Sequence, residues 1–221
     1  IRDVERSRGL GDVYKRQASY PRSGNTYLRT ILFNCFGIKT ASIYPNDLGG
    51  NKTLGNFVGH IEHNQNKTIT FQKGSIPIIK THKLNQDENR SIYIIRDGRA
   101  ASVSLWNFYG KKIPIKDIIL GNHPFGTWKD HLISWNPLKR PNTLLIKYED
   151  ILCNFEYVLN SIETFLEIKV LSKKLPSRDT VALFDGRWVR SKTDWKEKIS
   201  SEELNLFNKI NYPFLKEFGY E

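Results

Sequence analysis

The feature that most constrains this chain is a short turn that leads directly into an amphipathic helix. Pro21 fixes one backbone angle, and Ser23-Gly24 lets the chain turn sharply with little side chain in the way. Helical spacing follows from Gly24 onward, with apolar residues at Tyr27, Leu28, Ile31 and Leu32. A loop of this kind leaves several N–H groups unpaired at the positive end of the helix dipole, which suits a phosphate group.

Side chains around this turn offer further hydrogen-bond donors to an anion. They are those of Arg22, Ser23, Asn25 and Thr26. The alternative is a capped helix start without a ligand, because short Ser-Gly turns before helices are common. A Walker A loop is excluded, since no Lys-Ser or Lys-Thr pair follows Gly24.

The segment from Tyr20 to Tyr27 resembles the 5′-phosphosulfate loop of sulfotransferases that use 3′-phosphoadenylyl sulfate (PAPS). That loop usually reads Tyr-Pro-Lys-Ser-Gly-Thr-Thr-Trp. Here Arg22 stands at the common Lys position and Tyr27 at the frequent Trp position. The resemblance implies that this loop binds the phosphosulfate end of PAPS through Arg22, Ser23, Gly24, Asn25, Thr26 and Tyr27.

An apolar run over residues 75–83 turns polar abruptly and predicts a buried strand with Lys80 and His82 at its carboxyl end. Both side chains fall on one face of a strand, at the end where parallel sheets bind ligands. A histidine there can act as a general base, and a lysine can stabilise charge on a leaving oxygen. The alternative is a solvated strand end. The match to the family's Lys-Thr-His segment implies catalytic roles for His82 and Lys80, together with Arg22.

A second buried strand over residues 91–99 ends in charged residues and leads into a helix at 100–109. Arg96 at the strand end and Ser104 in the helix can converge on one anion. The alternative for Arg96 is an ion pair with Asp97. Sulfotransferases carry Arg and Ser at this spacing, which implies that Arg96 and Ser104 bind the 3′-phosphate of PAPS.

A third buried strand over residues 142–150 carries Tyr148 at its end. Tyr148 matches a family Tyr-Glu-Asp segment whose tyrosine contacts the adenine, and its alternative is an interfacial tyrosine with a hydrated hydroxyl. In the loop-rich segment 173–199, Asp194-Trp195-Lys196 matches a late family loop that grips the 3′-phosphate. Arg190 is the preferred arginine of that loop, with Arg187 as a second possibility.

One row of mostly aromatic residues is expected to pack in the core rather than to take part in catalysis. Trp128, His131, Leu132 and Trp135 fall on one helical face and resemble a family helix. Aromatic stripes at this spacing usually belong to the core, so His131 is a weak catalytic candidate.

Length and charge limit the number of domains and the kinds of partner that this chain can have. The 221 residues fit one domain with a substantial core, and no apolar run approaches the length of a membrane span. The net charge of +11 indicates an anionic partner, such as nucleic acid, a membrane surface, a polyanionic glycan or a phosphorylated cofactor. Cys35 falls inside the first helix pattern, which favours a buried free thiol. No residue cluster has metal-ligand spacing.

The first 17 residues are set apart from the rest. The sequence contains no Met, which indicates an incomplete reading frame, and residues 7–17 resemble a translated sequencing-library adapter. We therefore expect residues 1–17 to be a non-native leader, with the native N-terminus missing, and residues 18–221 to form a single domain. The apolar strand that normally precedes a nucleotide loop is replaced here by Asp12-Val13-Tyr14-Lys15-Arg16-Gln17.

Three apolar strands, each followed by a helix, predict a three-layer α/β fold with a mostly parallel sheet flanked by helices. Most candidate residues come directly after a strand, so they converge on one cleft. The resemblance covers residues 18–219, with four motif regions in the family order. It implies the P-loop-NTPase-like sulfotransferase fold.

The implied reaction transfers a sulfonyl group from PAPS to an acceptor hydroxyl or amine, on a small molecule or glycan, without a metal. His82 would take the acceptor proton, since its ordinary pKa of about 6.5 allows a neutral base near pH 7. Arg22 and Lys80 would stabilise charge on the sulfonyl group and the departing oxygen. We expect no nucleic-acid partner. The location stays open because the native N-terminus is missing, and a cytoplasmic one is favoured.

Two other functions remain open. The first is a nucleotide-dependent kinase or other phosphotransferase on a similar sheet. It would depend on Mg²⁺ and carry a lysine in the turn before the first helix, and that lysine is missing. A non-catalytic module that binds a polyanion predicts a continuous basic face with interleaved aromatic residues. The basic residues here are scattered, and many lie at strand ends.

Overall fold

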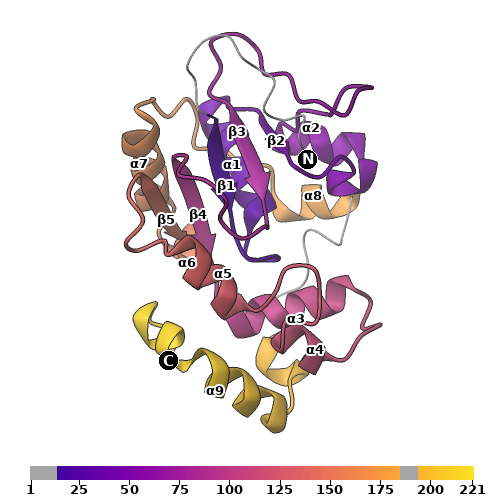
Figure 1. Cartoon of the computed structure of the whole chain (residues 1–221). Coiled ribbons are helices and arrows are strands. Elements are labelled where there is room, and N and C mark those ends of the chain that lie inside the picture. The colour runs from indigo at the N-terminus through magenta and orange to yellow at the C-terminus, as the bar shows by residue number, and fades with distance from the viewer. Residues whose placement is uncertain (1–13, 185–193) are drawn as a thin grey trace.

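Five parallel strands form one sheet in this computed structural model, which describes residues 14–184 and 194–221. Their order across the sheet is β2-β3-β1-β4-β5 (Figure 1). The strands are β1 (Lys15–Ala18), β2 (Thr40–Ser42), β3 (Ile78–Thr81), β4 (Ser91–Ile95) and β5 (Thr143–Lys147). The parallel α/β sheet predicted from the sequence is confirmed.

The central strand, β1, is built from mostly polar residues. It pairs in parallel with β3 on one side and with β4 on the other. Gln17 is fully buried and donates from Nε2 to the backbone carbonyl of Asn25, 2.8 Å away. Arg16 extends to Asp87 and forms an ion pair of 2.6 Å. Lys15–Gln17, which we assigned to the leader, therefore contributes to the sheet.

Helices cover both faces of the sheet, as the sequence pattern predicts. They are α1 (Asn25–Phe36), α2 (Lys52–Val58), α3 (Gly98–Phe108), α4 (Ile115–Ile119), α5 (Trp128–Trp135), α6 (Tyr148–Cys153), α7 (Phe155–Leu166), α8 (Arg178–Phe184) and α9 (Ser201–Glu217), with the 3-10 turns η2 (Asp47–Gly50) and η3 (Trp195–Lys198).

Strand β4 shows how two cores arise from one sheet. Ile92 and Ile94 pack on one face with α1, α6 and α7, whereas Tyr93 and Ile95 pack on the other face with α3, α4, α5 and α9. Alternate residues of a strand point to opposite faces, so a strand covered on both sides is apolar throughout. Figure 1 shows α9, in yellow, beside α3 and α4 at the lower end of the molecule.

Two helices begin with side-chain caps, and the residues expected to pack are buried. Asp97 caps α3 by accepting from the backbone N–H of Arg99, 2.9 Å away. Ser200 and Glu203 form a capping box at the start of α9. His131 is fully buried in α5 and its Nδ1 lies 2.8 Å from the hydroxyl of Tyr93, so it belongs to the core. Cys35 is a buried free thiol, as expected.

The segment between α1 and β3 contains more structure than its polar sequence indicates. It forms the edge strand β2, the 3-10 turn η2 and the helix α2. Leu48 and Gly49 in η2 have positive φ angles of 58° and 62°, which turn the chain back toward α2. This segment brings Tyr44 and Asp47 to the carboxyl edge of the sheet, next to β3.

Candidate active site

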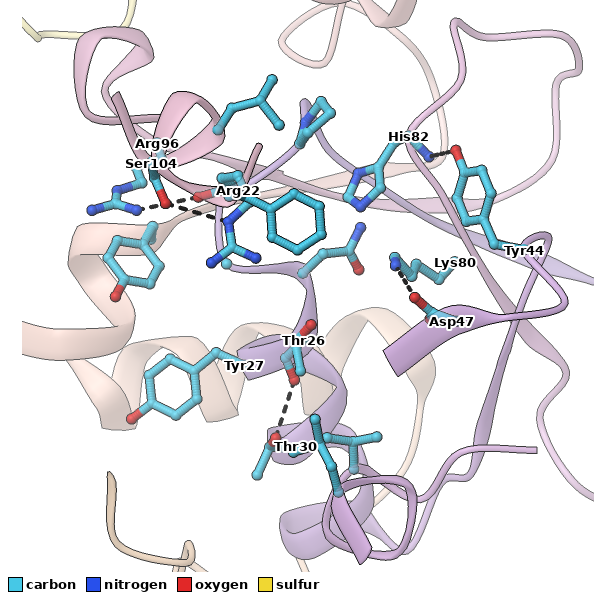
Figure 2. A pocket seen from close by; sticks show the side chains of 18 of the residues that line it. Arg22, Thr26, Tyr27, Thr30, Tyr44, Asp47, Lys80, His82, Arg96 and Ser104 are labelled. Atoms are coloured by element: carbon cyan, nitrogen blue, oxygen red, sulfur yellow. Dashed lines mark hydrogen bonds and ion pairs between the residues drawn. The ribbon is translucent and has the colours of Figure 1, made fainter. Parts of the chain in front are cut away.

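The carboxyl edge of the sheet borders a cavity of about 280 Å³. Most of the predicted site residues line it: Arg22, Gly24, Asn25, Thr26, Tyr27, Lys80, His82, Arg96, Ser104 and Tyr148. These side chains come from the segments that follow β1, β3, β4 and β5, which end at the same edge of the sheet. Figure 2 shows several of them pointing toward a common space.

The turn before α1 has the backbone expected of an anion-binding loop. Arg22 and Gly24 both have positive φ angles, 67° and 102°. Gly24 is the N-cap of α1 and supplies no side-chain cap, so the first-turn N–H groups have no intrahelical partner, and Gly24, Asn25 and Thr26 border the cavity. Ser23 does not line the cavity, but its hydroxyl is buried without a hydrogen-bond partner among the described residues.

Tyr148 closes off the space next to this turn. A Cβ on Gly24 would lie 2.5 Å from Cδ2 of Tyr148 and 3.1 Å from Cδ1 of Ile94. Only glycine therefore fits here, for reasons of both space and backbone conformation.

His82 is held in one tautomer by the turn after β1. Its Nδ1 lies 2.9 Å from the backbone carbonyl of Ser19, and because a carbonyl only accepts, Nδ1 carries the proton. Nε2 is then the unprotonated nitrogen. Burial, followed by the nearby Lys80 charge, holds the pKa of His82 well below its usual value. The ring is therefore a neutral base at pH 7.

Lys80 lies at the cavity wall in a buried ion pair. Its Nζ donates to Oδ1 of Asp47 at 2.7 Å, and Oδ2 of Asp47 accepts from Nη1 of Arg29 at 2.7 Å. Burial raises the pKa of Asp47, but the charges of Lys80 and Arg29 outweigh it and leave the pKa below its usual value. Asp47 is thus a carboxylate between two cations.

Arg96 and Ser104 meet at the turn before α1. Nη1 of Arg96 donates to the backbone carbonyl of Arg22 at 3.2 Å, and Nε of Arg22 donates to Oγ of Ser104 at 3.3 Å (Figure 2). The guanidinium of Arg96 also lies over the ring of Tyr148, 4.6 Å from its centre. Asp97, the alternative partner of Arg96, pairs with Arg99 instead.

The predicted late loop lies partly outside the described residues. Arg190, and Arg187 as its alternative, lie outside the described residues, so the late-loop ligand stays a prediction. Asp194-Trp195-Lys196 lies next to α3, where the ring of Trp195 contacts the guanidinium of Arg99 at 4.8 Å.

Among the residues that border the cavity, three that contact His82 or Lys80 were not named from the sequence: Tyr44, Asp47 and Phe125. Tyr44 stacks on His82 with ring centres 6.0 Å apart, and Phe125 meets the same imidazole edge-on at 5.9 Å. Asp47 pairs with Lys80. All three lie in loop or turn segments with no periodic pattern. The sequence offered one signal: a buried Lys80 needs a carboxylate to neutralise its charge, which could have pointed to an acidic partner such as Asp47.

A family model of the sulfotransferase domain matches residues 18–185. The chain belongs to this family. Its fold is similar to that of mouse sulfotransferase SULT7A1 complexed with PAP (adenosine 3′,5′-bisphosphate), at 18% identity and a TM-score of 0.63, covering 93% of this chain and 86% of that one. It is also similar to retinol dehydratase in a complex with retinol and PAP, at 17% identity and a TM-score of 0.65, covering 94% and 82%.

A second structure of retinol dehydratase, with androsterone and PAP, matches at 16% identity and a TM-score of 0.59, covering 94% and 82%. Among curated proteins, none matches this sulfotransferase-domain chain by sequence. Within residues 14–184 and 194–221, no group of three or more His, Cys, Asp or Glu side chains is placed to hold a metal ion. None of the helices in those ranges has the length and apolar character that crossing a membrane requires.

Proposed function

We propose that this sulfotransferase-domain protein transfers the sulfonyl group of PAPS to an acceptor hydroxyl or amine, with His82 as the general base. The observation that carries the proposal is the position of His82, whose free Nε2 shares a cavity with the turn before α1. The PAP complexes of the structurally similar proteins support PAPS as the donor.

The residues present fit a nucleotide with two phosphate ends. The N–H groups of the first turn of α1, next to the predicted loop residues Ser23 and Gly24, suit the 5′-phosphate. Arg96 and Ser104 lie together on the other side of that turn, which suits the 3′-phosphate. The ring of Tyr148 lies beside Gly24 and Arg96, where it can contact the adenine.

In the proposed reaction the protein mainly positions groups and neutralises charge. His82 accepts the acceptor proton at Nε2 as the acceptor oxygen or nitrogen bonds to sulfur and the bond from sulfur to the phosphate oxygen breaks. Lys80 and Arg22 stabilise the negative charge on the sulfonyl oxygens and on the departing oxygen. Arg22 cannot give up a proton, so any proton for the leaving oxygen comes from Lys80.

Several walls of the cavity are apolar or aromatic, which supports a small-molecule acceptor. They include Leu54, Val58, Leu105, Phe108, Tyr109 and Phe125. The retinol and androsterone of the retinol dehydratase complexes are small apolar molecules with an alcohol group, in keeping with such walls.

A binding experiment separates this function from its alternatives. PAP should raise the melting temperature of the protein, by a stabilisation of about 2.7 kcal/mol at a concentration 100 times its Kd, whereas ATP with Mg²⁺ should not. Sulfonyl transfer from ³⁵S-labelled PAPS to a panel of alcohols, phenols and amines then tests the reaction. A shift with ATP and Mg²⁺ but not with PAP would favour a phosphotransferase, and no shift with either would remove the nucleotide site.

A further inference from the structure

A cluster of buried charges lies directly behind the cavity, and Asp47 is at its centre. The carboxylate accepts from Lys80 at one oxygen and from Arg29 at the other, both at 2.7 Å. The side chains of Arg29, Lys80 and Asp47 are 0%, 5% and 6% exposed. Two cations thus share a single anion in a region from which water is largely excluded.

Arg29 is held in place by contacts within the protein, one of them to this carboxylate. Each of its three nitrogens donates to the protein: Nε to Oγ1 of Thr40 at 2.7 Å, Nη1 to Asp47, and Nη2 to the carbonyl of Thr40 at 3.1 Å and to Nδ1 of His60 at 2.6 Å. Unlike Lys80 and Asp47, Arg29 does not line the cavity. Its contacts fix the position of the carboxylate rather than of a ligand.

One turn supports both functional residues at the end of β3. The backbone N–H of Asp47 donates to the carbonyl of Tyr44 at 3.1 Å, which closes the turn. The hydroxyl of Tyr44 accepts from the backbone N–H of His82 at 3.1 Å, while the carboxylate of Asp47 holds Lys80. Figure 2 shows the two contacts side by side. The turn therefore sets Lys80 and His82 relative to each other.

We propose that Asp47 is a positioning residue that keeps the ammonium of Lys80 charged and in place at the cavity wall beside His82. This inference rests on the proposed sulfonyl transfer, in which Lys80 stabilises the departing oxygen. Asp47 does not touch the reacting atoms and acts through Lys80.

The charges around Lys80 set its pKa, so the proposal predicts how the rate of transfer depends on pH. Burial lowers the pKa of Lys80, Asp47 raises it, and Arg29 and Arg22 lower it further. The other titratable groups around Lys80, Asp47 and Arg29 include His82 and Tyr44 at the cavity, and His60 and Glu62 beside Arg29. The carboxylate of Asp47 contacts Lys80 directly and stabilises its charged, protonated form. Removing the charge of Asp47 must therefore lower the pKa of Lys80.

The test is a pH profile of sulfonyl transfer by wild type and by Asp47→Asn, between pH 5 and 10, with an aliphatic alcohol that does not titrate in this range. The alkaline limb of kcat should move to lower pH by about one unit or more. At pH 8.5, kcat should fall roughly 10²-fold, because a charge that stabilises the leaving oxygen is lost. Asp87→Asn is the control, since it also removes the carboxylate of an ion pair, the partly buried one with Arg16, but at the amino end of the sheet.

The outcomes distinguish this inference from the proposed function. If wild type shows no transfer, the proposed function fails. If wild type is active but Asp47→Asn lowers kcat equally at every pH, as a structural defect would, then Asp47 does not act through the charge of Lys80. If the single variant does not fold, the double variant Arg29→Gln/Asp47→Asn takes its place, because it keeps the net charge of the cluster. Its alkaline limb should still move to lower pH, because Asp47 contacts Lys80 and affects the pKa of Lys80 more than Arg29 does. An unmoved limb in that variant overturns the inference.

Discussion

The imidazole Nδ1 of His82 lies 2.9 Å from the backbone carbonyl of Ser19, and this contact decides which nitrogen of the ring can accept a proton. Ser19 directly follows the central strand β1, and its hydroxyl oxygen is 3.3 Å from the same nitrogen. The strand that leads into the turn before α1 therefore also orients the proposed base. The two proposed functions of the cavity, holding a nucleotide and accepting a proton, would thus be linked by this one short segment.

Replacing His82 with Ala should abolish turnover and leave nucleotide binding intact. Loss of a general base typically lowers kcat about 10²- to 10⁴-fold, whereas the turn before α1 does not depend on the imidazole. The measurement pairs transfer kinetics with a PAP melting shift. His63→Ala is the control, because His63 contacts the carbonyl of Ser42 and does not line the cavity. Full turnover in His82→Ala would place the base elsewhere.

The acid limb of the rate profile should lie below pH 6.5 and should depend on Lys80. Activity requires neutral His82, so it falls as pH drops through a pKa that burial and the Lys80 charge hold well below 6.5. Replacing Lys80 with Gln removes one of these causes, so the acid limb should move to higher pH while kcat falls. Profiles of kcat/KM between pH 4.5 and 8 test this. A limb that stays in place would show that Lys80 does not face His82.

The sequence predicted the parts of this site that are local. Strand ends and the turn before α1 carry short motifs whose residues are adjacent in the chain, so their convergence follows once the strands are parallel. Thus the loop from Arg22 to Tyr27, His82 and Arg96 were all placed at the correct edge. Their assigned roles stay predictions.

The parts that were missed depend on contacts between distant segments. Asp47 meets Arg29 and Lys80 only after η2 folds against α1 and β3, and nothing in the spacing of these residues indicates it. Residues 15–17 were set apart with the leader because residues 7–17 resemble a translated adapter. They nevertheless pair on both sides, with β3 and β4, because tertiary context often overrides local strand preference. That residues 1–17 are a non-native leader stays a prediction.

Replacing Gly24 with Ala should destabilise the protein and remove PAP binding. A Cβ there meets Tyr148 at 2.5 Å, and φ is +102°. Gly50 is a matched control, because its φ of +70° imposes a similar backbone penalty, about 1–2 kcal/mol for a non-glycine residue, yet a Cβ meets nothing within 4 Å. Urea unfolding should show a larger loss for Gly24→Ala than for Gly50→Ala, and only Gly24→Ala should lose the PAP melting shift. Equal losses would mean that Tyr148 does not confine this turn.

Replacing Arg96 with Gln should weaken PAP far more than adenosine 5′-phosphosulfate, which lacks the 3′-phosphate. Arg96 is fixed by the carbonyl of Arg22 and the ring of Tyr148, so its remaining donors are held next to the turn before α1. A hydrogen bond to a charged group contributes about 1.5–3 kcal/mol, so the Kd for PAP should rise about 10- to 100-fold. Titration calorimetry with both nucleotides measures the difference.

Arg90→Gln supplies the matched control for the Arg96 variant. Arg90 directly precedes β4, as Arg96 directly follows it, so the same positive charge is removed at the opposite end of one strand. A general effect of net charge would weaken PAP in both variants, whereas a specific 3′-phosphate site predicts a loss in Arg96→Gln alone. If Arg96→Gln weakens both nucleotides equally, Arg96 binds the part they share, and the 3′-phosphate must be held by other residues.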